Sequence, residues 1–143
     1  MKVISKIALL ILIIALLYLL ISGNLLSYSP FVIAGQLLAV GLAVWARRSF
    51  QAGQFSIHAE PLEGSMLRTG PYRYIRHPMY TFGLLLVWLS AAGHFSFTTV
   101  LIGLTVTGVI AVRIVTEEQF LSERFPEYAA YAQRTRRIIP FVV

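Results

Sequence analysis

Three arginines, three tyrosines and one histidine are concentrated in the segment from Arg68 to Tyr80. Proline disfavours helical geometry in the residue before it, so His77 is expected to lie just outside a helix that begins at Pro78. Amide groups at a helix start favour a carboxylate or a phosphate. These residue types predict either a ligand site or an interfacial belt, in which Tyr and Arg lie at the level of the lipid headgroups.

A second polar cluster, Arg113 to Glu118, directly follows a long apolar stretch. Arg113 and Glu117 are four residues apart and share one face of a helix, whereas Glu118 points about 140° away from Arg113. The two glutamates therefore need not serve the same partner. A surface ion pair between Arg113 and Glu117 is the structural alternative, although ionisable groups near membrane depth are functional candidates by default.

Four apolar stretches must position these clusters. A transmembrane helix needs about 20 predominantly apolar residues, and the stretches 3–21, 31–46, 78–92 and 97–112 are interpreted as spans. A signal peptide is the alternative for the first stretch, but that stretch is long for one and no small-residue cleavage site follows it. We expect an all-α, polytopic membrane protein with four transmembrane helices and a cytosolic helical tail, 113–143. Residues 1–143 form a single domain in this interpretation.

Composition and charge agree with a membrane protein, since 57% of the residues are hydrophobic and only 13% are charged. The cations occupy three segments, which contain Lys2 and Lys6, then Arg47, Arg48, Arg68, Arg73 and Arg76, then Arg113, Arg124, Arg134, Arg136 and Arg137. The connections 23–30 and 93–96 carry no charge. The positive-inside rule therefore predicts an integral membrane protein with both termini and the long middle loop in the cytosol. Cations dispersed around membrane exits argue against nucleic-acid binding.

The stretches 78–92 and 97–112 are joined by a short turn, so the two polar clusters are expected to meet at the cytosolic face. Their carboxylates and aromatic rings favour a cation, and their arginines favour an anion. A zwitterion with an additional positive centre would fit such a niche.

Three segments occur in a specific order and spacing: Gly70-Pro71-Tyr72-Arg73-Tyr74-Ile75-Arg76-His77-Pro78-Met79-Tyr80, then Arg113 with Glu117-Glu118 and Leu121, then Phe125, Tyr128, Tyr131 and Arg136-Arg137-Ile138-Ile139-Pro140. With this arrangement the chain resembles the integral-membrane methyltransferases that include isoprenylcysteine carboxyl methyltransferase and the phospholipid N-methyltransferases. One departure is the segment Phe125-Pro126-Glu127-Tyr128, which is one residue shorter than the family pattern. The C-terminal helix can therefore begin differently here.

The resemblance implies S-adenosylmethionine as the methyl donor and a lipophilic or lipidated substrate at the cytosolic membrane face, in contact with membrane lipids. The positions that match the family's cofactor pocket are Tyr72, His77, Pro78, Tyr80, one of the pair Glu117 and Glu118, and, through backbone contacts to the nucleoside, Met66 and Leu67. Arg113 matches a position that faces the substrate.

The resemblance implies an acceptor such as a prenylcysteine-like carboxylate or a phospholipid amine. A carboxylate is ionised at neutral pH and needs only a cation to orient it, a role that suits Arg113. An amine must first lose a proton, and Glu117 or Glu118 can assist. Arg113 and Glu117 are therefore the expected catalytic residues. A base is one role for His77, but a hydrogen bond to the cofactor is expected because Pro78 fixes its position.

Two other functions are compatible with the architecture. One is a membrane reductase similar to the sterol reductases, although no additional phosphate-binding segment for its dinucleotide is evident. The other is a small four-span transporter or accessory subunit, but the predicted spans carry no charge near mid-membrane. The chain contains no cysteine, and His58 and His94 lie apart from both clusters, so no metal site is predicted.

Overall fold

The computed structural model describes residues 2–50 and 67–139, and within these ranges the chain is helical. In chain order, it contains α1 (Lys2–Ile21), α2 (Pro30–Arg48), the short 3-10 helix η1 (Gly70–Arg73), α3 (Pro78–Gly93), α4 (Phe97–Arg124) and α5 (Tyr128–Arg134). The four long helices confirm the helices expected from the apolar stretches. Pro30 and Pro78 begin α2 and α3, where a missing amide hydrogen costs no hydrogen bond.

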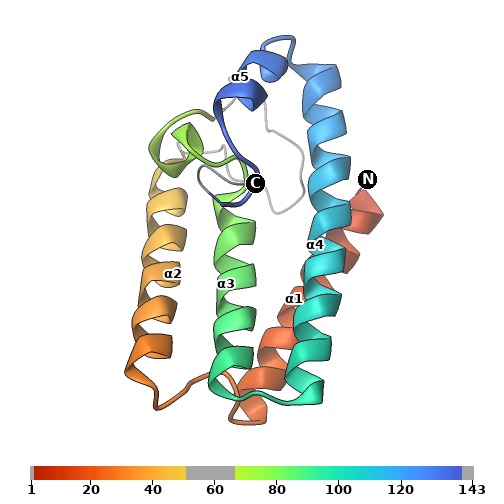
Figure 1. The fold of residues 1–143 in the computed structure, drawn as a ribbon. Helices are drawn as coiled ribbons and strands as arrows, with labels where there is room; N and C mark the ends of the chain where they lie inside the picture. Colours follow the sequence, from red (N-terminus) through yellow and green to blue (C-terminus); the bar gives the residue numbers. More distant parts are fainter. Residues whose placement is uncertain (1, 51–66, 140–143) are drawn as a thin grey trace.

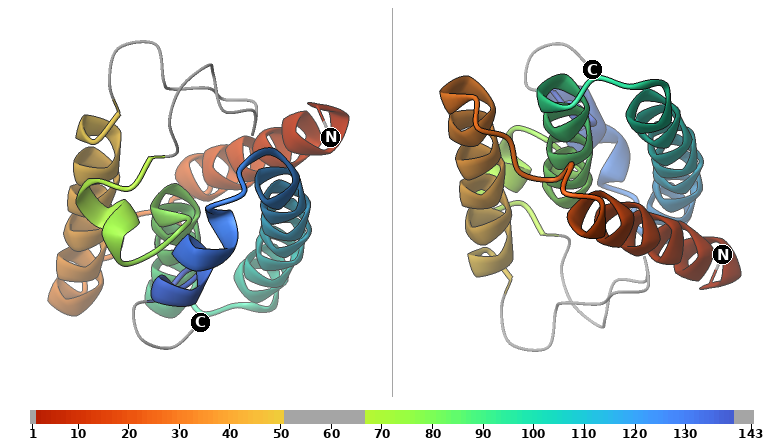
Figure 2. Two further views of the ribbon diagram at one scale, coloured as in Figure 1. Left: turned by 90° about the horizontal axis from the view of Figure 1, so that it is seen from above. Right: turned by 90° about the horizontal axis from the view of Figure 1, so that it is seen from below.

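The central helix is α3, which packs between α2 and α4, and α1 is inclined to these three and packs mainly against α4 (Figures 1 and 2). The buried core lies where α1, α3 and α4 meet, and its members are Ala15, Leu19, Val87, Val106, Ile110 and Ile114. The close helix contacts use glycine: at Gly103 an added Cβ atom would lie only 3.2 Å from the ring of Trp88.

Large apolar side chains also cover the outside of the bundle. Leu38 on α2 is 76% exposed and Leu104 on α4 is 57% exposed. Two helices, α2 and α4, are long and apolar enough to cross a membrane, while α3 and the segment Lys6–Ile21 of α1 are shorter apolar helices. At about 1.5 Å per residue α4 is roughly 42 Å long, more than the 30 Å hydrocarbon core of a bilayer.

Polar contacts fasten the end of the bundle at which α1 connects to α2 and α3 connects to α4. Both the side-chain amide of Gln36 and the hydroxyl of Ser90 donate to the carbonyl oxygen of Leu25, at 2.6 and 3.0 Å. The ring nitrogen Nε2 of His94 lies 2.7 Å from the carbonyl oxygen of Leu26. These bonds attach the partly exposed connection between α1 and α2 to helices α2 and α3.

The opposite end, which we call the polar end, contains η1, the start of α3, the end of α4 and α5 (Figure 1). η1 begins at Gly70, which has a φ of +58° and on which a Cβ atom would collide with the side chain of Ser49. Glycine is therefore required for η1 to lie against the end of α2. The segment after α5 returns to the start of α3 and forms a parallel bridge between Ile75 and Arg136.

Candidate functional site

His77 lies at the junction between η1 and α3, as the proline after it predicts. Its φ and ψ of −126° and 57° are not helical, and the residue is only 4% exposed. Its imidazole stacks on the ring of Tyr80, with ring centroids 5.3 Å apart and an interplanar angle of 16°. The imidazole of His77 is therefore buried at the polar end and held against the ring of Tyr80.

Glu118 holds the centre of the polar end together. Its Oε1 accepts a hydrogen bond from Nε of Arg76 at 2.7 Å and lies 3.3 Å from Nε2 of His77, while its Oε2 accepts from Nε of Arg137 at 2.9 Å. Glu118 lies in the charged extension of α4, beyond its apolar part. Burial alone would raise the pKa of this carboxyl, but the contacts with His77, Arg76 and Arg137 lower the pKa to about 2.

Arg76 also ties α5 to this centre. Its Nη1 donates to the carbonyl oxygens of Ala132 and Thr135 at 2.8 and 2.6 Å. One guanidinium thus joins the start of α3, the end of α4 and the end of α5. The sequence analysis did not assign this role to Arg76 or Arg137, and the only available signal was an arginine directly before the His-Pro pair.

Glu117 belongs to a different set of contacts from Glu118, as the helical spacing predicts. The hydroxyl of Tyr80 donates to Oε2 of Glu117 at 2.6 Å. The guanidinium carbon of Arg113 lies 5.1 Å from the centroid of the same tyrosine ring, and Arg113 is 9% exposed. A carboxylate, a guanidinium and two stacked rings therefore share one niche, which we call the Glu117 niche.

Three tyrosines from η1 and α5 lie beside these clusters. The hydroxyl of Tyr131 donates to the carbonyl oxygen of Tyr72 at 2.7 Å, and burial raises the pKa of Tyr131 to about 12. Burial, and then the charge of Glu117, raise the pKa of Tyr72. The residue Tyr128 is 4% exposed, and its hydroxyl oxygen is buried without a hydrogen-bond partner in the described structure. Such a group costs about 1–3 kcal/mol unless a ligand or a water molecule satisfies it.

The structure corrects the expectation of free amides at the start of α3. The amide of His77 donates to the carbonyl oxygen of Arg137 at 3.0 Å, and the amides of Tyr80 and Thr81 both donate to the carbonyl oxygen of His77. The returning C-terminal segment thus uses the amide of His77, and the first turn of α3 itself uses the amides of Tyr80 and Thr81. The positive character near the site comes instead from guanidinium groups.

The remaining predicted residues are distributed as follows. Pro78 is buried in the first turn of α3, next to His77. Leu67 is half-buried and begins the second described range, whereas Met66 lies outside the described residues. The same end of the bundle thus holds all six residues, among which α3 and α4 pack against each other and η1 lies against α2: Tyr72, His77, Tyr80, Arg113, Glu117 and Glu118.

A family model of the phospholipid methyltransferases matches residues 29–128, which is more than half of the chain. The chain belongs to the phospholipid methyltransferase family. The matched range extends from the start of α2 to the first residue of α5, and it includes both polar clusters. Members of the phospholipid methyltransferase family are membrane methyltransferases that generally use S-adenosylmethionine, so the family agrees with the resemblance seen in the sequence.

One relative of this chain is the cobalt-zinc-cadmium resistance protein CzcN of Cupriavidus metallidurans. The two are 35% identical over 77 residues, which make up 53% of this chain and 36% of that protein. The chain therefore matches about a third of the length of CzcN. Among the described residues, no group of three or more His or Glu side chains gathers where a metal ion could be held.

Proposed function

We propose that this protein is a membrane-embedded methyltransferase that uses S-adenosylmethionine to methylate a lipophilic substrate at the cytosolic membrane face. The observation that carries the proposal is the Glu117 niche, which lies at the polar end of an apolar bundle in a chain of this family. The whole chain, residues 1–143, acts as one unit in this proposal.

The side chains of the niche fit the proposed cofactor. A carboxylate and the stacked rings of His77 and Tyr80 suit a sulfonium and an ammonium group, because both are cations that favour aromatic faces and negative charge. The unsatisfied hydroxyl of Tyr128 suits a polar group of the same ligand. We assign cofactor contacts to Tyr72, His77, Pro78, Tyr80 and Glu117, together with Met66 and Leu67. Both oxygens of Glu118 already accept protein donors, so Glu118 is proposed to position His77 and Arg76.

When bound, the cofactor would supply an electrophilic methyl group: a lone pair of the acceptor forms the bond to the methyl carbon, and the electron pair of the broken carbon–sulfur bond remains on sulfur. The residues of the chain contribute position and charge. Arg113 would orient an acceptor carboxylate or a headgroup phosphate through its planar guanidinium. With an amine acceptor, Glu117 would take the proton that the amine must lose, directly or through Tyr80, which donates to it at 2.6 Å.

We further propose four membrane spans, with both termini in the cytosol. The support is the distribution of the cations, which lie at the polar end or close to it, together with the exposed apolar side chains along the helices. If the hydrocarbon core begins near Phe97, about 20 residues of α4 cross it, and Glu117 lies at the inner boundary. Single cysteines placed in the connection 23–30 and after Val143 test this topology. Labelling of both cysteines from the same side of a sealed vesicle would refute it.

The activity is tested by incubating the purified protein, in vesicles that contain candidate lipids, with methyl-labelled S-adenosylmethionine. Transfer of label to the lipid fraction is expected. Base treatment then releases label from methyl esters but not from methylamines, which decides the class of acceptor. Calorimetry with S-adenosylhomocysteine provides a measurement that does not depend on the acceptor. Absence of binding in lipid, together with binding of a nicotinamide dinucleotide, would refute the proposal and favour the membrane reductase.

A further inference from the structure

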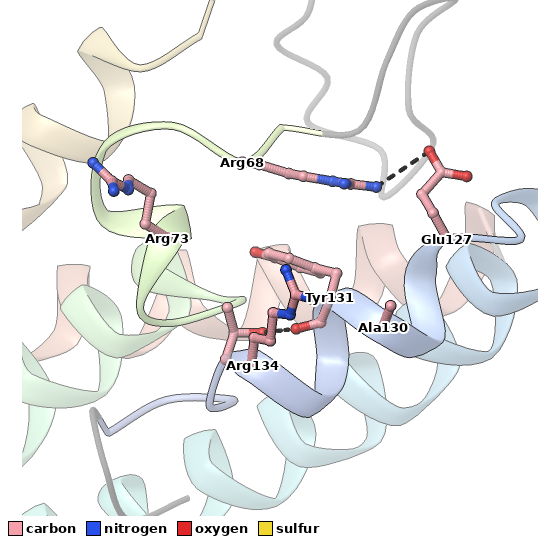
Figure 3. A pocket seen from close by; sticks show the side chains of 7 residues that line it. Arg68, Arg73, Glu127, Ala130, Tyr131 and Arg134 are labelled. Atoms are coloured by element: carbon pink, nitrogen blue, oxygen red, sulfur yellow. Dashed lines mark hydrogen bonds and ion pairs between the residues drawn. The ribbon is translucent and has the colours of Figure 1, made fainter.

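A second hollow at the polar end lies outside the Glu117 niche. It has a volume of about 380 Å³ and lies between the segment around η1 and α5. Its main polar side chains are Arg68, Arg73, Glu127, Tyr131 and Arg134, whose arrangement Figure 3 shows. We call this hollow the arginine pocket. None of its lining residues is His77, Tyr80, Arg113 or Glu117, so it is not the niche to which methyl transfer was assigned.

The arginine pocket has an excess of positive charge. Three arginines and one glutamate line the pocket, and the only ion pair described within it joins Nη2 of Arg68 to Oε1 of Glu127 at 3.3 Å. Both of these side chains are about half exposed, at 47% and 48%, so their pairing is weak. Within the described ranges, neither Arg73 nor Arg134 forms a hydrogen bond or an ion pair with another side chain. The pocket therefore suits an anion that two guanidinium groups can approach from two elements.

The position of the pocket indicates the source of the anion. Thr69, next to Arg68, donates from its hydroxyl to the carbonyl oxygen of Ser49 at 3.4 Å, and Gly70 packs against Ser49 and Trp45. These contacts fix the segment at the end of α2, where the apolar helix ends in Arg47 and Arg48. In the proposed membrane placement this is the level of the cytosolic lipid headgroups, where arginine and tryptophan side chains concentrate.

The pocket is also held open from within the protein. Tyr131 lines the pocket while its hydroxyl donates to the carbonyl oxygen of Tyr72, and Thr135 lines it while its carbonyl oxygen accepts from Arg76. The pocket wall is thus anchored to η1 and to the Arg76–Glu118 contact. The guanidinium groups of Arg73 and Arg134 project from these anchored elements (Figure 3).

We propose that the arginine pocket binds a phosphate group, carried by an anionic lipid headgroup of the cytosolic leaflet. Arg73 and Arg134 would provide charge-assisted hydrogen bonds to the phosphate oxygens, and the approaching phosphate would compete with Glu127 for Arg68. The inference uses the proposed membrane placement but not the proposed methyl transfer. Its consequence is an anchoring site that holds η1 and α5 against an anionic membrane surface.

The test is lipid retention by the purified full chain, measured by native mass spectrometry after exchange into phosphatidylglycerol or phosphatidylcholine. The double variant Arg73→Gln/Arg134→Gln is compared with Arg48→Gln/Arg124→Gln, which removes the same charge from exposed arginines outside the pocket. Wild type and control are expected to prefer phosphatidylglycerol. The pocket variant should lose roughly tenfold to thirtyfold more affinity than the control variant, because both lose the same general attraction to an anionic surface but only the pocket variant loses two charge-assisted hydrogen bonds.

Further measurements identify the source of the phosphate. Inorganic phosphate, titrated calorimetrically in a neutral detergent, should bind far more weakly than phosphatidylglycerol; equal strength would assign the pocket to a soluble phosphate and overturn the lipid source. Equal losses in the pocket and control variants would overturn the site itself. So would displacement of phosphatidylglycerol by S-adenosylhomocysteine, because the pocket would then belong to the cofactor site.

Folding and the proposed activity are checked separately. Both double variants should melt at the wild-type temperature, and Arg134→Gln alone provides a milder variant with a smaller loss of the same preference. Binding of S-adenosylhomocysteine should be equal in all variants. Absence of that binding in wild type would refute the proposed methyl transfer. The preference for phosphatidylglycerol would still test whether the arginine pocket binds a lipid phosphate.

Discussion

Nε of Arg76 donates to Oε1 of Glu118 at 2.7 Å, and this contact joins the residue before His77 to the charged extension of α4. The side chains of Arg76 and Glu118 are 10% and 12% exposed, so the pair is largely removed from water. Arg137 also donates to Glu118, but its side chain is 50% exposed. The same carboxylate therefore has one buried and one exposed arginine partner. Substitution of each arginine can measure its separate contribution to the stability of the protein.

Arg76→Gln is expected to destabilise the protein far more than Arg137→Gln. Loss of Arg76 leaves a buried carboxylate with less compensation and two carbonyl oxygens without their donor, which together cost about 2–4 kcal/mol. Loss of the exposed Arg137 should cost less than about 1 kcal/mol. Denaturant titration of both variants in detergent micelles measures the difference. Equal losses would show that Arg76 does not hold the polar end together.

The stability of the protein should depend on pH through Glu118. The folded-state pKa is lowered from 4.5 to about 2, so the folded form binds fewer protons than the unfolded form between these values. The stabilising contribution is therefore fully present above about pH 4.5 and is lost as the pH falls toward 2. Melting temperatures of wild type and Glu118→Gln should converge over this interval and differ by a constant amount above it. Glu123→Gln, an exposed change on the same helix, should retain the wild-type profile.

The long helices and their ends were predictable because they depend on local signals. Apolar runs indicated where α1 to α4 lie, and prolines at residues 30 and 78 set two of the starts. That Glu117 and Glu118 contact different partners also followed from helical geometry, since adjacent residues point in different directions. Tyr80, His77 and Arg113 could be assigned to one end because a short turn joins α3 to α4.

The contacts that close the polar end could not be predicted in this way. The bridge between Ile75 and Arg136 joins segments about sixty residues apart, and neither segment has a periodic pattern. The bridge uses the amides of Arg76 and Arg136, and the next residue of the same C-terminal segment, Arg137, accepts the amide of His77, so the expectation that this amide is free was wrong. The orphaned hydroxyl of Tyr128 is likewise a consequence of three-dimensional packing, which residue types alone do not reveal.

Tyr128→Phe should leave the unliganded protein as stable as wild type, or slightly more stable, because it removes a buried hydroxyl that has no partner. If that hydroxyl bonds the proposed cofactor, affinity for S-adenosylhomocysteine should fall about tenfold. Tyr131→Phe is the matched control: its hydroxyl donates to the backbone of η1, so this variant should lose about 1 kcal/mol of stability. Unchanged affinity in Tyr128→Phe would instead indicate that a water molecule satisfies the hydroxyl. Thermal melts and calorimetry measure both quantities.

Arg113 is expected to act on the acceptor rather than on the cofactor. Arg113→Ala should lower turnover about a hundredfold while affinity for S-adenosylhomocysteine remains nearly unchanged, because orientation matters most when the acceptor and the methyl group are aligned. Arg113→Lys should recover only part of the activity, since an ammonium group lacks the planar fork that binds two oxygens. Radiolabel transfer and calorimetry on the same preparations provide the two measurements.

The rival explanation for such a loss is structural, because Arg113 lies over the ring of Tyr80, whose hydroxyl donates to Glu117. If Arg113 only holds this arrangement, Glu117→Ala should reproduce its phenotype, and the double variant should be no worse than either single one. Tyr80→Phe separates the two roles further, since it keeps the ring beneath Arg113 but removes the bond to Glu117. Normal turnover in Arg113→Ala, or a loss of cofactor affinity equal to that in Glu117→Ala, would return Arg113 to a purely structural role.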